Sequence, residues 1–195
     1  MKKRIALLAS GGGSNAEALL KAMQDPAFPA EAVLVFSNRP GAGVLEKAAR
    51  YGVPAVIRDH KDYPDREAFD AELLKVLEAV RPDFLVLAGY LRILTPGFVR
   101  AYPHRILNVH PSLLPKFGGP GMHGHHVHEA VLAAGETESG ATVHWVDEGV
   151  DSGGIVLQQK VPVLPGDSPE SLAARVLTAE HQVYAAALKK VCLGE

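Results

Sequence analysis

The chain has 195 residues, of which 47% are hydrophobic and 22% charged, and this composition is typical of one globular domain with an ordinary apolar core. Its 20 basic and 22 acidic residues leave a formal net charge of −2, so we expect neither nucleic acid nor a membrane as a partner. No apolar stretch approaches the roughly 18 residues that span a bilayer. The single cysteine, Cys192, forms no internal disulfide, so we expect a cytoplasmic protein.

Short apolar runs alternate with segments of helical periodicity, which predicts an α/β fold with helices on both faces of a mostly parallel sheet. In chain order the predicted elements are strand 4–9, helix 14–24, strand 32–37, helix 43–51, strand 54–57, helix 66–80, strand 84–88, strand 105–109, helix 127–133, strand 141–146, strand 155–161 and helix 170–190. Over the last two strands, Thr142, His144 and Gln158 alternate with apolar neighbours, as in a half-solvated hairpin. The prediction is a Rossmann-like sheet of about seven strands with an antiparallel extension in the C-terminal half.

A glycine-rich loop, Gly11–Ala16, follows the first predicted strand and opens the first helix. Glycine permits close approach of a ligand to the backbone, and free amides at a helix start attract an anion. The spacing also fits the G-x-G-x-x-A pattern of dinucleotide sites, but those expect an acid where this chain has Phe36–Arg39. We therefore favour a phosphate or a phosphate ester, with a plain turn as the alternative.

Asn108 and His110 lie in the run Leu-Asn-Val-His-Pro-Ser-Leu-Leu-Pro. Side chains alternate along a strand, so the two residues share a face, about 7 Å apart, at the carboxyl end where open α/β sheets bind ligands. An amide and an imidazole at this spacing can both reach one carbonyl oxygen. The alternative is a histidine that caps a loop and an asparagine that turns the chain, but the rigid segment 111–115 favours catalysis.

Two further segments are ambiguous by themselves. Residues 147–154 form a glycine-rich loop with three acidic residues, and such loops are usually solvated turns. Residues 87–94 form an apolar stretch interrupted by Arg92, which periodicity alone assigns to the core with a snorkelling arginine.

Together these segments resemble the phosphoribosylglycinamide formyltransferases, a family of folate-dependent enzymes of purine synthesis, along essentially the whole chain. The Asn-x-His-Pro-Ser-Leu-Leu-Pro run with a later Asp-x-Gly loop is specific to folate formyl transfer and its hydrolytic relatives. The Gly-Ser-Asn loop indicates the ribonucleotide enzymes within that group. The matching segments are 10–15, 36–38, 65–67, 87–94, 108–115, 142–154 and 180–181.

The resemblance implies one formyltransferase domain over residues 1–195, with a phosphate-binding half at 1–100 and a catalytic, folate-binding half at 101–195. It implies 10-formyltetrahydrofolate as the co-substrate, glycinamide ribonucleotide as the acceptor and no metal; a homodimer is left open. The implied catalytic residues are Asn108, His110 and Asp151. The implied acceptor-binding residues are Gly12, Gly13, Ser14, Asn15 and Arg66 at the phosphate and Glu180 at the ribose; the implied folate-binding residues are Tyr90, Leu91, Arg92, Ile93, Leu94, Asn108, Val146 and Asp147.

The chemistry of these residue types agrees with that implication. An amine that attacks a formyl carbon creates a tetrahedral intermediate whose negative oxygen must be stabilised. Asn108 and a protonated His110 can donate hydrogen bonds to it, and a nearby Asp151 would favour the charged form of His110. Asp151, directly or through a water, is the candidate for moving the proton from the amine to the leaving nitrogen.

The segment 117–128, here named the histidine-rich loop, is longer than this family's usual loop and holds His123, His125, His126 and His128. We expect an active-site flap rather than a metal site, because no defined tetrahedral ligand set with cysteine is present.

The rival functions are formyltetrahydrofolate hydrolase, methionyl-tRNA formyltransferase and a non-catalytic nucleotide- or folate-binding module. The two rival enzymes carry an extra domain that we do not expect in this chain. A net charge of −2 does not favour tRNA binding.

Overall fold

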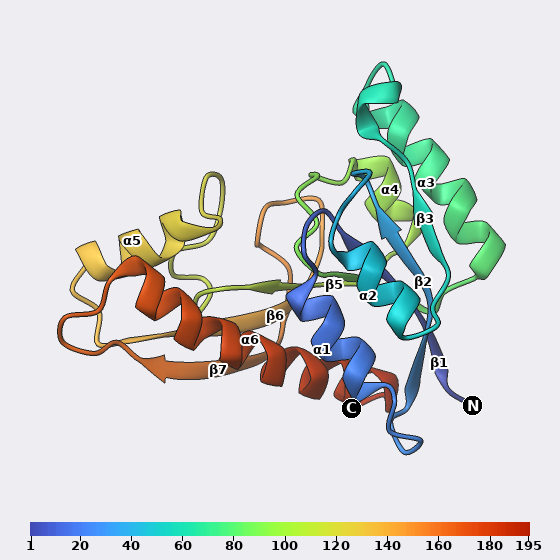
Figure 1. Cartoon of the computed structure of the whole chain (residues 1–195). Coiled ribbons are helices and arrows are strands. Elements are labelled where there is room, and N and C mark those ends of the chain that lie inside the picture. The colour runs from blue at the N-terminus through green and yellow to red at the C-terminus, as the bar shows by residue number, and fades with distance from the viewer.

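A seven-stranded sheet runs through the computed structural model, which describes residues 1–195 (Figure 1). The strand order is β3-β2-β1-β4-β5-β6-β7. The strands are β1 (Lys3–Ala9), β2 (Ala30–Ser37), β3 (Ala55–Ile57), β4 (Phe84–Leu87), β5 (Ile106–His110), β6 (Glu138–Trp145) and β7 (Ile155–Pro162). All pairs from β3 to β5 are parallel, whereas β6 pairs antiparallel with β5 and β7. The predicted fold class, including its antiparallel extension, is confirmed.

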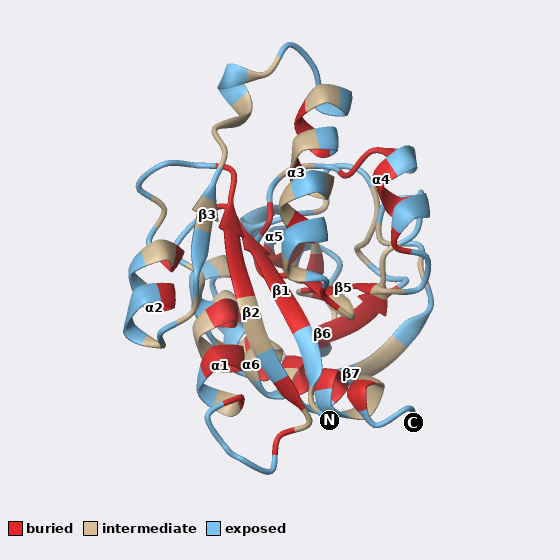
Figure 2. Ribbon diagram, turned by 90° about the vertical axis from the view of Figure 1, so that its right-hand side faces the viewer, coloured by how far each residue is buried: buried red, intermediate tan, exposed pale blue.

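The helices cover the two faces of the sheet unequally. They are α1 (Ser14–Ala22), α2 (Val44–Arg50), α3 (Arg66–Val80), α4 (Pro96–Ala101), α5 (His125–Ala133) and α6 (Pro169–Cys192), with a short 3₁₀ turn η1 (His60–Asp62). One apolar cluster lies between the sheet and α1, α2, α5 and α6, and a second lies between the sheet and α3 and α4. Buried residues of β1 and β2 form the centre of the molecule (Figure 2).

The buried part of strand β1, Ile5–Ala9, is apolar at every position, whereas Lys3 and Arg4 at its start are exposed. Ile5, Leu7 and Ala9 pack into the first cluster, whereas Ala6 and Leu8 pack into the second. Successive side chains of a strand point to opposite faces, so a strand that is covered on both faces needs an apolar residue at every position. This residue pattern therefore places β1 in the middle of the sheet.

The helix limits follow local capping. Asp65 accepts a hydrogen bond from Ala68 N at 2.8 Å at the start of α3, and Pro82 follows its end, so the predicted range 66–80 is confirmed. Helix α4 was not predicted; Thr95 caps it and Pro96 occupies its first turn. Helix α5 begins at His125 rather than at the predicted residue 127, so the last part of the histidine-rich loop is helical.

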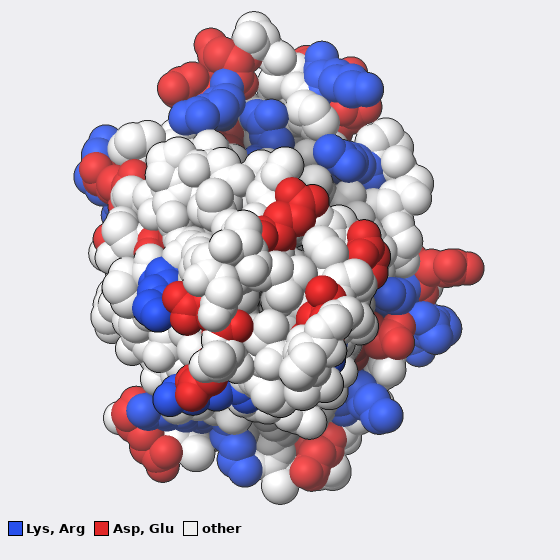
Figure 3. Space-filling model, turned by 90° about the vertical axis from the view of Figure 1, so that its left-hand side faces the viewer, with Lys and Arg blue, Asp and Glu red and all other residues white.

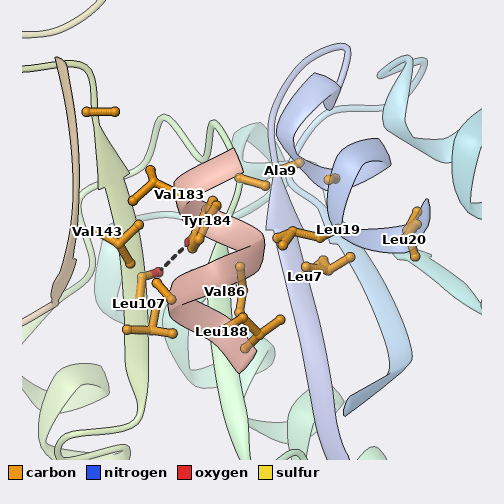
Figure 4. Packing of buried hydrophobic residues seen from close by; sticks show 14 of the residues in the cluster. Leu7, Ala9, Leu19, Leu20, Val86, Leu107, Val143, Val183, Tyr184 and Leu188 are labelled. Carbon is orange, nitrogen blue, oxygen red and sulfur yellow. Dashed lines mark hydrogen bonds between the residues drawn. The ribbon is translucent and has the colours of Figure 1, made fainter. Parts of the chain in front are cut away.

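Tyr184 of α6 links the helix layer to two central strands. Its side chain is fully buried, and its hydroxyl lies 2.7 Å from Leu87 O and 3.1 Å from Leu107 O (Figure 4). Burial raises the pKa of Tyr184 well above its ordinary value, so the hydroxyl remains a donor. Leu87 ends β4 and Leu107 precedes Asn108, so this contact fixes α6 against the strands that carry the candidate site.

We predict that Tyr184→Phe lowers the free energy of unfolding by about 1–3 kcal/mol, because it removes the one buried proton that the carbonyls of Leu87 and Leu107 share. Urea unfolding followed by circular dichroism measures the change. Tyr51→Phe is the matched control, since the Tyr51 hydroxyl is partly exposed and forms no hydrogen bond within the protein. Equal stability of Tyr184→Phe and wild type would contradict the role assigned to this hydroxyl.

Candidate active site

A pocket of about 140 Å³ opens beside the carboxyl ends of β4 and β5. It gathers residues from four parts of the chain: the segment after β4, the middle of β5, the end of β6 and the loop that follows β6. Its lining includes the predicted site residues Tyr90, Arg92, Ile93, Leu94, Asn108, Val146, Asp147 and Asp151. Leu91 does not line it and is 65% exposed, and His110 is buried behind it. The structure thus brings together most of the residues predicted for catalysis and folate binding.

The carboxylate of Asp151 lies between two buried histidines. Its Oδ2 is 3.4 Å from His110 Nδ1, and its Oδ1 is 3.8 Å from His144 Nε2. Oδ2 also accepts a hydrogen bond from Gly119 N at 3.1 Å. One acidic side chain therefore contacts β5, β6 and the histidine-rich loop.

The loop after β6 is folded so that Asp151 can reach inward. Asp147 Oδ1 accepts hydrogen bonds from Gly149 N at 2.9 Å and Ser152 Oγ at 2.8 Å, which closes a tight turn. At Gly153 an added Cβ would lie 1.7 Å from Trp145 O, so only glycine fits. Asp151 itself has a φ of 55°, an uncommon backbone state for a residue with a side chain. The acidic loop is therefore held in one shape by its own contacts, although most of its residues are exposed to solvent.

His144 joins the candidate site although the sequence reasoning did not select it. It pairs with Asn108 across β5 and β6, and its Nε2 lies 3.3 Å from Asn108 Nδ2. Its Nδ1 lies 3.1 Å from Trp145 O; a carbonyl only accepts, so Nδ1 carries the proton and Nε2 accepts from Asn108. Burial lowers the pKa of His144, which favours this neutral form. The alternating pattern of residues 141–146 was the one available signal.

His110 is engaged by the histidine-rich loop. Its Nε2 lies 2.8 Å from Phe117 O, and this carbonyl requires a proton on Nε2. Strand β6 fixes the segment between His110 and Phe117. Thr142 Oγ1 donates to Ser112 O at 2.7 Å and accepts from Leu114 N at 3.1 Å. The rigid support predicted for His110 is thus present as buried hydrogen bonds.

The glycine loop forms the start of α1, at the carboxyl end of β1. Gly13 is the N-cap with a φ of 71°, and an added Cβ would lie 2.5 Å from Val44 Cγ2. The first of the helical hydrogen bonds runs from Glu17 N to Gly13 O at 2.8 Å, so the preceding helix amides have no partner within α1. Gly11 and Gly12 have open space around them, as a ligand-binding loop requires.

Asn15 and Glu180 extend this group from α1 to α6. Asn15 Nδ2 donates to Glu180 Oε1 at 3.1 Å, and Asn15 Oδ1 is buried without a partner. Burial raises the pKa of Glu180 to about 7, and the hydrogen bond from Asn15 opposes that shift. Arg66, by contrast, is exposed at the start of α3 and makes no hydrogen bond or ion pair with the glycine loop.

The four histidines predicted to lie in the flap have different surroundings. His123, His125 and His126 are exposed, whereas His128 is buried in α5 and burial lowers its pKa. No group of three or more His, Cys, Asp or Glu side chains is arranged to hold a metal ion. Figure 3 shows the side of the molecule that lies on the left in Figure 1, where α5 is found. The side chains of Lys, Arg, Asp and Glu are sparse over broad parts of that side. Also, no helix is long and apolar enough to cross a membrane.

Comparison with known proteins identifies the class of protein to which this sheet, this pocket and this glycine loop belong. Residues 3–188 match the family model described as Formyl transferase, and the chain belongs to this family. Among its relatives, the trifunctional purine biosynthetic protein adenosine-3 of Drosophila pseudoobscura pseudoobscura is 50% identical over 99% of this chain. This chain spans only 14% of that protein's length.

The named single-activity relatives are phosphoribosylglycinamide formyltransferases. The chloroplastic enzyme of Arabidopsis thaliana is 40% identical over 98% of this chain and 66% of its own length. The crystal structure of phosphoribosylglycinamide formyltransferase from Brucella melitensis is 47% identical, with a TM-score of 0.93, over 100% of this chain and 98% of that one. Glycinamide ribonucleotide transformylase 1 from Symbiobacterium toebii is 42% identical with a TM-score of 0.93, over 99% of this chain and 89% of that one. The resemblance seen in the sequence is confirmed.

The raised pKa of Glu180 leads to a prediction about stability that does not depend on any ligand. The folded protein keeps the Glu180 proton up to about pH 7, whereas the unfolded chain releases it near the ordinary value of 4.5. The contribution of this group to stability is therefore complete below about pH 4.5 and is lost as pH rises to about 7. Glu180→Gln should gain stability relative to wild type over this range, by up to about 1.4 kcal/mol per pH unit.

Urea unfolding at pH 5 and pH 7.5 measures that difference. Glu31→Gln, which changes an exposed glutamate on β2, is the control and should show no such trend. A Glu180→Gln difference that does not vary with pH would show that Glu180 titrates at an ordinary value in the folded protein.

Proposed function

We propose that this protein transfers the formyl group of 10-formyltetrahydrofolate to the amine of glycinamide ribonucleotide, a step of purine biosynthesis. The observation that carries the proposal is the pocket in which Asn108, His144 and Asp151 adjoin residues 90–94. The glycine loop, which can bind an anion, follows β1. Strand β1 neighbours β4, the strand that precedes residues 90–94. The two substrates would meet at this edge of the sheet, as ligands do in open α/β folds.

The donor folate would enter the pocket through residues 90–94. Their backbone groups would read the edge of the pterin ring, while the apolar lining would cover its faces. Ile93, which lines the pocket and is 62% exposed, would offer apolar surface to the rest of the folate. Val146 and Asp147 would close the opposite side.

The acceptor would bind through its phosphate and its ribose. The free amides at the start of α1 attract a phosphate, with Gly12, Gly13, Ser14 and Asn15 around it. The carboxylate of Glu180, held by Asn15, would accept hydrogen bonds from ribose hydroxyls. The role of Arg66 at the phosphate stays a prediction.

In the reaction, the acceptor amine forms a bond to the formyl carbon and the bond from that carbon to the folate nitrogen breaks. The negative oxygen of the intermediate would accept hydrogen bonds from Asn108 Nδ2 and His110. Asp151 would carry the proton from the amine to the leaving nitrogen, directly or through a water. Because His144 accepts from Asn108 Nδ2, it orients the amide that faces the reacting group. No covalent enzyme intermediate is needed.

Both donors have protein partners in the structure. Asn108 donates to His144, and His110 donates to Phe117 O. For His110 to reach the formyl oxygen through Nε2, the Phe117 carbonyl must move away, which gives the histidine-rich loop a role as a flap. Such a flap would exclude water, which would otherwise hydrolyse the donor.

The rival functions would require different products or different binding surfaces. A hydrolase would release formate without an acceptor, and a tRNA formyltransferase would need a surface for nucleic acid. The named relatives favour the ribonucleotide enzyme, and small molecules are the expected substrates. Cytoplasmic location and a homodimer stay open predictions.

We predict that His110→Ala folds normally and loses about 10²–10³-fold in kcat, because one donor to the developing charge is removed. The change in folate absorbance with glycinamide ribonucleotide present measures turnover, and circular dichroism checks the fold. His104→Ala, an exposed histidine that does not line the pocket, is the control. Turnover of His110→Ala close to that of wild type would return His110 to the role of a loop cap.

Ser14→Ala and Arg66→Ala should each raise the KM for glycinamide ribonucleotide and leave the affinity for folate nearly unchanged. The reason is that both residues are assigned to the phosphate and neither lines the folate pocket. Steady-state kinetics with each substrate varied in turn separates the two effects. Equal weakening of both ligands would mean that the two subsites are wrongly assigned.

A further inference from the structure

Ser10 occupies the junction between the two proposed subsites. It is 2% exposed, directly follows β1 and directly precedes the glycine loop. Its backbone N donates to Gly89 O at 3.0 Å, and its hydroxyl accepts a hydrogen bond from Leu91 N at 2.9 Å. The residue that begins the acceptor loop therefore holds the backbone of the donor segment at two points.

The same hydroxyl is fixed on its other side. Ser10 Oγ donates to Asn38 Oδ1 at 2.6 Å, and Asn38, which is 1% exposed, lies next to the end of β2. Asn38 Nδ2 in turn lies 3.2 Å from His60 Nδ1, in η1. The Ser10 hydroxyl donates its one proton to Asn38, and its oxygen accepts the hydrogen bond from Leu91 N. His60 Nδ1 also lies 3.2 Å from the backbone O of Asn38, so the outer end of the network has two alternative partners, whereas the Ser10–Asn38 hydrogen bond is buried.

The network spans three adjacent strands. The strand order β2-β1-β4 places Asn38, Ser10 and Gly89 side by side at the carboxyl edge of the sheet. On the acceptor side only one peptide bond separates Ser10 from Gly11, whose carbonyl accepts from Val44 N at 3.1 Å. On the donor side one peptide bond separates Leu91 from Arg92, which lines the folate pocket.

We infer that the Ser10 hydroxyl is a positioning residue that couples the two subsites, so that a ligand on the glycine loop changes the affinity of the pocket formed by residues 90–94. The assignment of substrates to the two subsites rests on the proposed function. A ligand that shifts either segment alters the same buried hydrogen bonds. Such coupling is reciprocal, because each ligand must change the affinity of the other by the same factor.

The coupling factor is measured as the ratio of two dissociation constants for glycinamide ribonucleotide, without and with saturating tetrahydrofolate, which has no formyl group to transfer. Isothermal titration calorimetry gives both values. We expect a factor of a few-fold to about tenfold in wild type and a factor near 1 in Ser10→Ala. Each dissociation constant measured alone should change much less than the ratio.

Ser37→Ala is the matched control, since Ser37 is a fully buried serine at the end of β2 whose hydroxyl contacts only the backbone of Arg39. If Ser10 had a purely structural role, both variants would have a lower melting temperature than wild type, and both would keep the wild-type coupling factor. That result, or a wild-type factor of 1, would overturn the inference.

A second readout does not depend on which substrates are correct. Inorganic phosphate titrated into ¹⁵N-labelled protein should shift the Leu91 and Arg92 amide resonances in wild type and in Ser37→Ala but not in Ser10→Ala. If wild type shows no such shift, the coupling is absent. If the shifts occur as expected but no formyl transfer is detected, the proposed function fails and the coupling stands.

Discussion

The carboxylate of Asp151 is the contact on which the arrangement of the candidate site depends. It is the one side chain that touches His110 on β5, His144 on β6 and the backbone of Gly119 in the histidine-rich loop. A carboxylate that is only 12% exposed needs partners of this kind, because an unpaired charge is costly where little water reaches it. The loop after β6 meets that need through the Asp147 turn and through Gly153, where no side chain fits. The same contacts that stabilise the carboxylate also hold Asp151 at the wall of the pocket.

Strand topology supplies the rest of the site. The antiparallel register of β5 and β6 puts His144 opposite Asn108. On the other side of β5 the parallel strands β4 and β1 bring residues 90–94 and the glycine loop to the same edge. Tyr184 then ties α6, which also carries Glu180, to the carbonyls of Leu87 and Leu107. The glycine loop, residues 90–94 and the pocket residues of β5 and β6 thus lie on one connected framework of strands and helix.

Much of this could be predicted from the sequence where a local cause exists. Strand β1 and helix α3 were predicted because an unbroken apolar run, a helical spacing of apolar residues and the stop at Pro82 are all local signals. Helix α4, with six residues, was too short for periodicity to reveal, although Thr95 and Pro96 marked its start. His144 was missed because its importance comes from the β5–β6 register, which is a long-range property. Leu91 was expected in the folate pocket but points to solvent, since the backbone between Gly89 and Arg92 turns it away.

The most direct test of the account is single-turnover formyl transfer by Asp151→Asn. The amide is nearly the same size as the carboxylate and can still accept from Gly119 N, so the loop should keep its shape, while the charge and the proton-transfer capacity are lost. The account predicts that the rate of transfer falls by about 10²–10⁴-fold while the dissociation constants of both substrates stay within a few-fold of wild type. Transfer at close to the wild-type rate would contradict it.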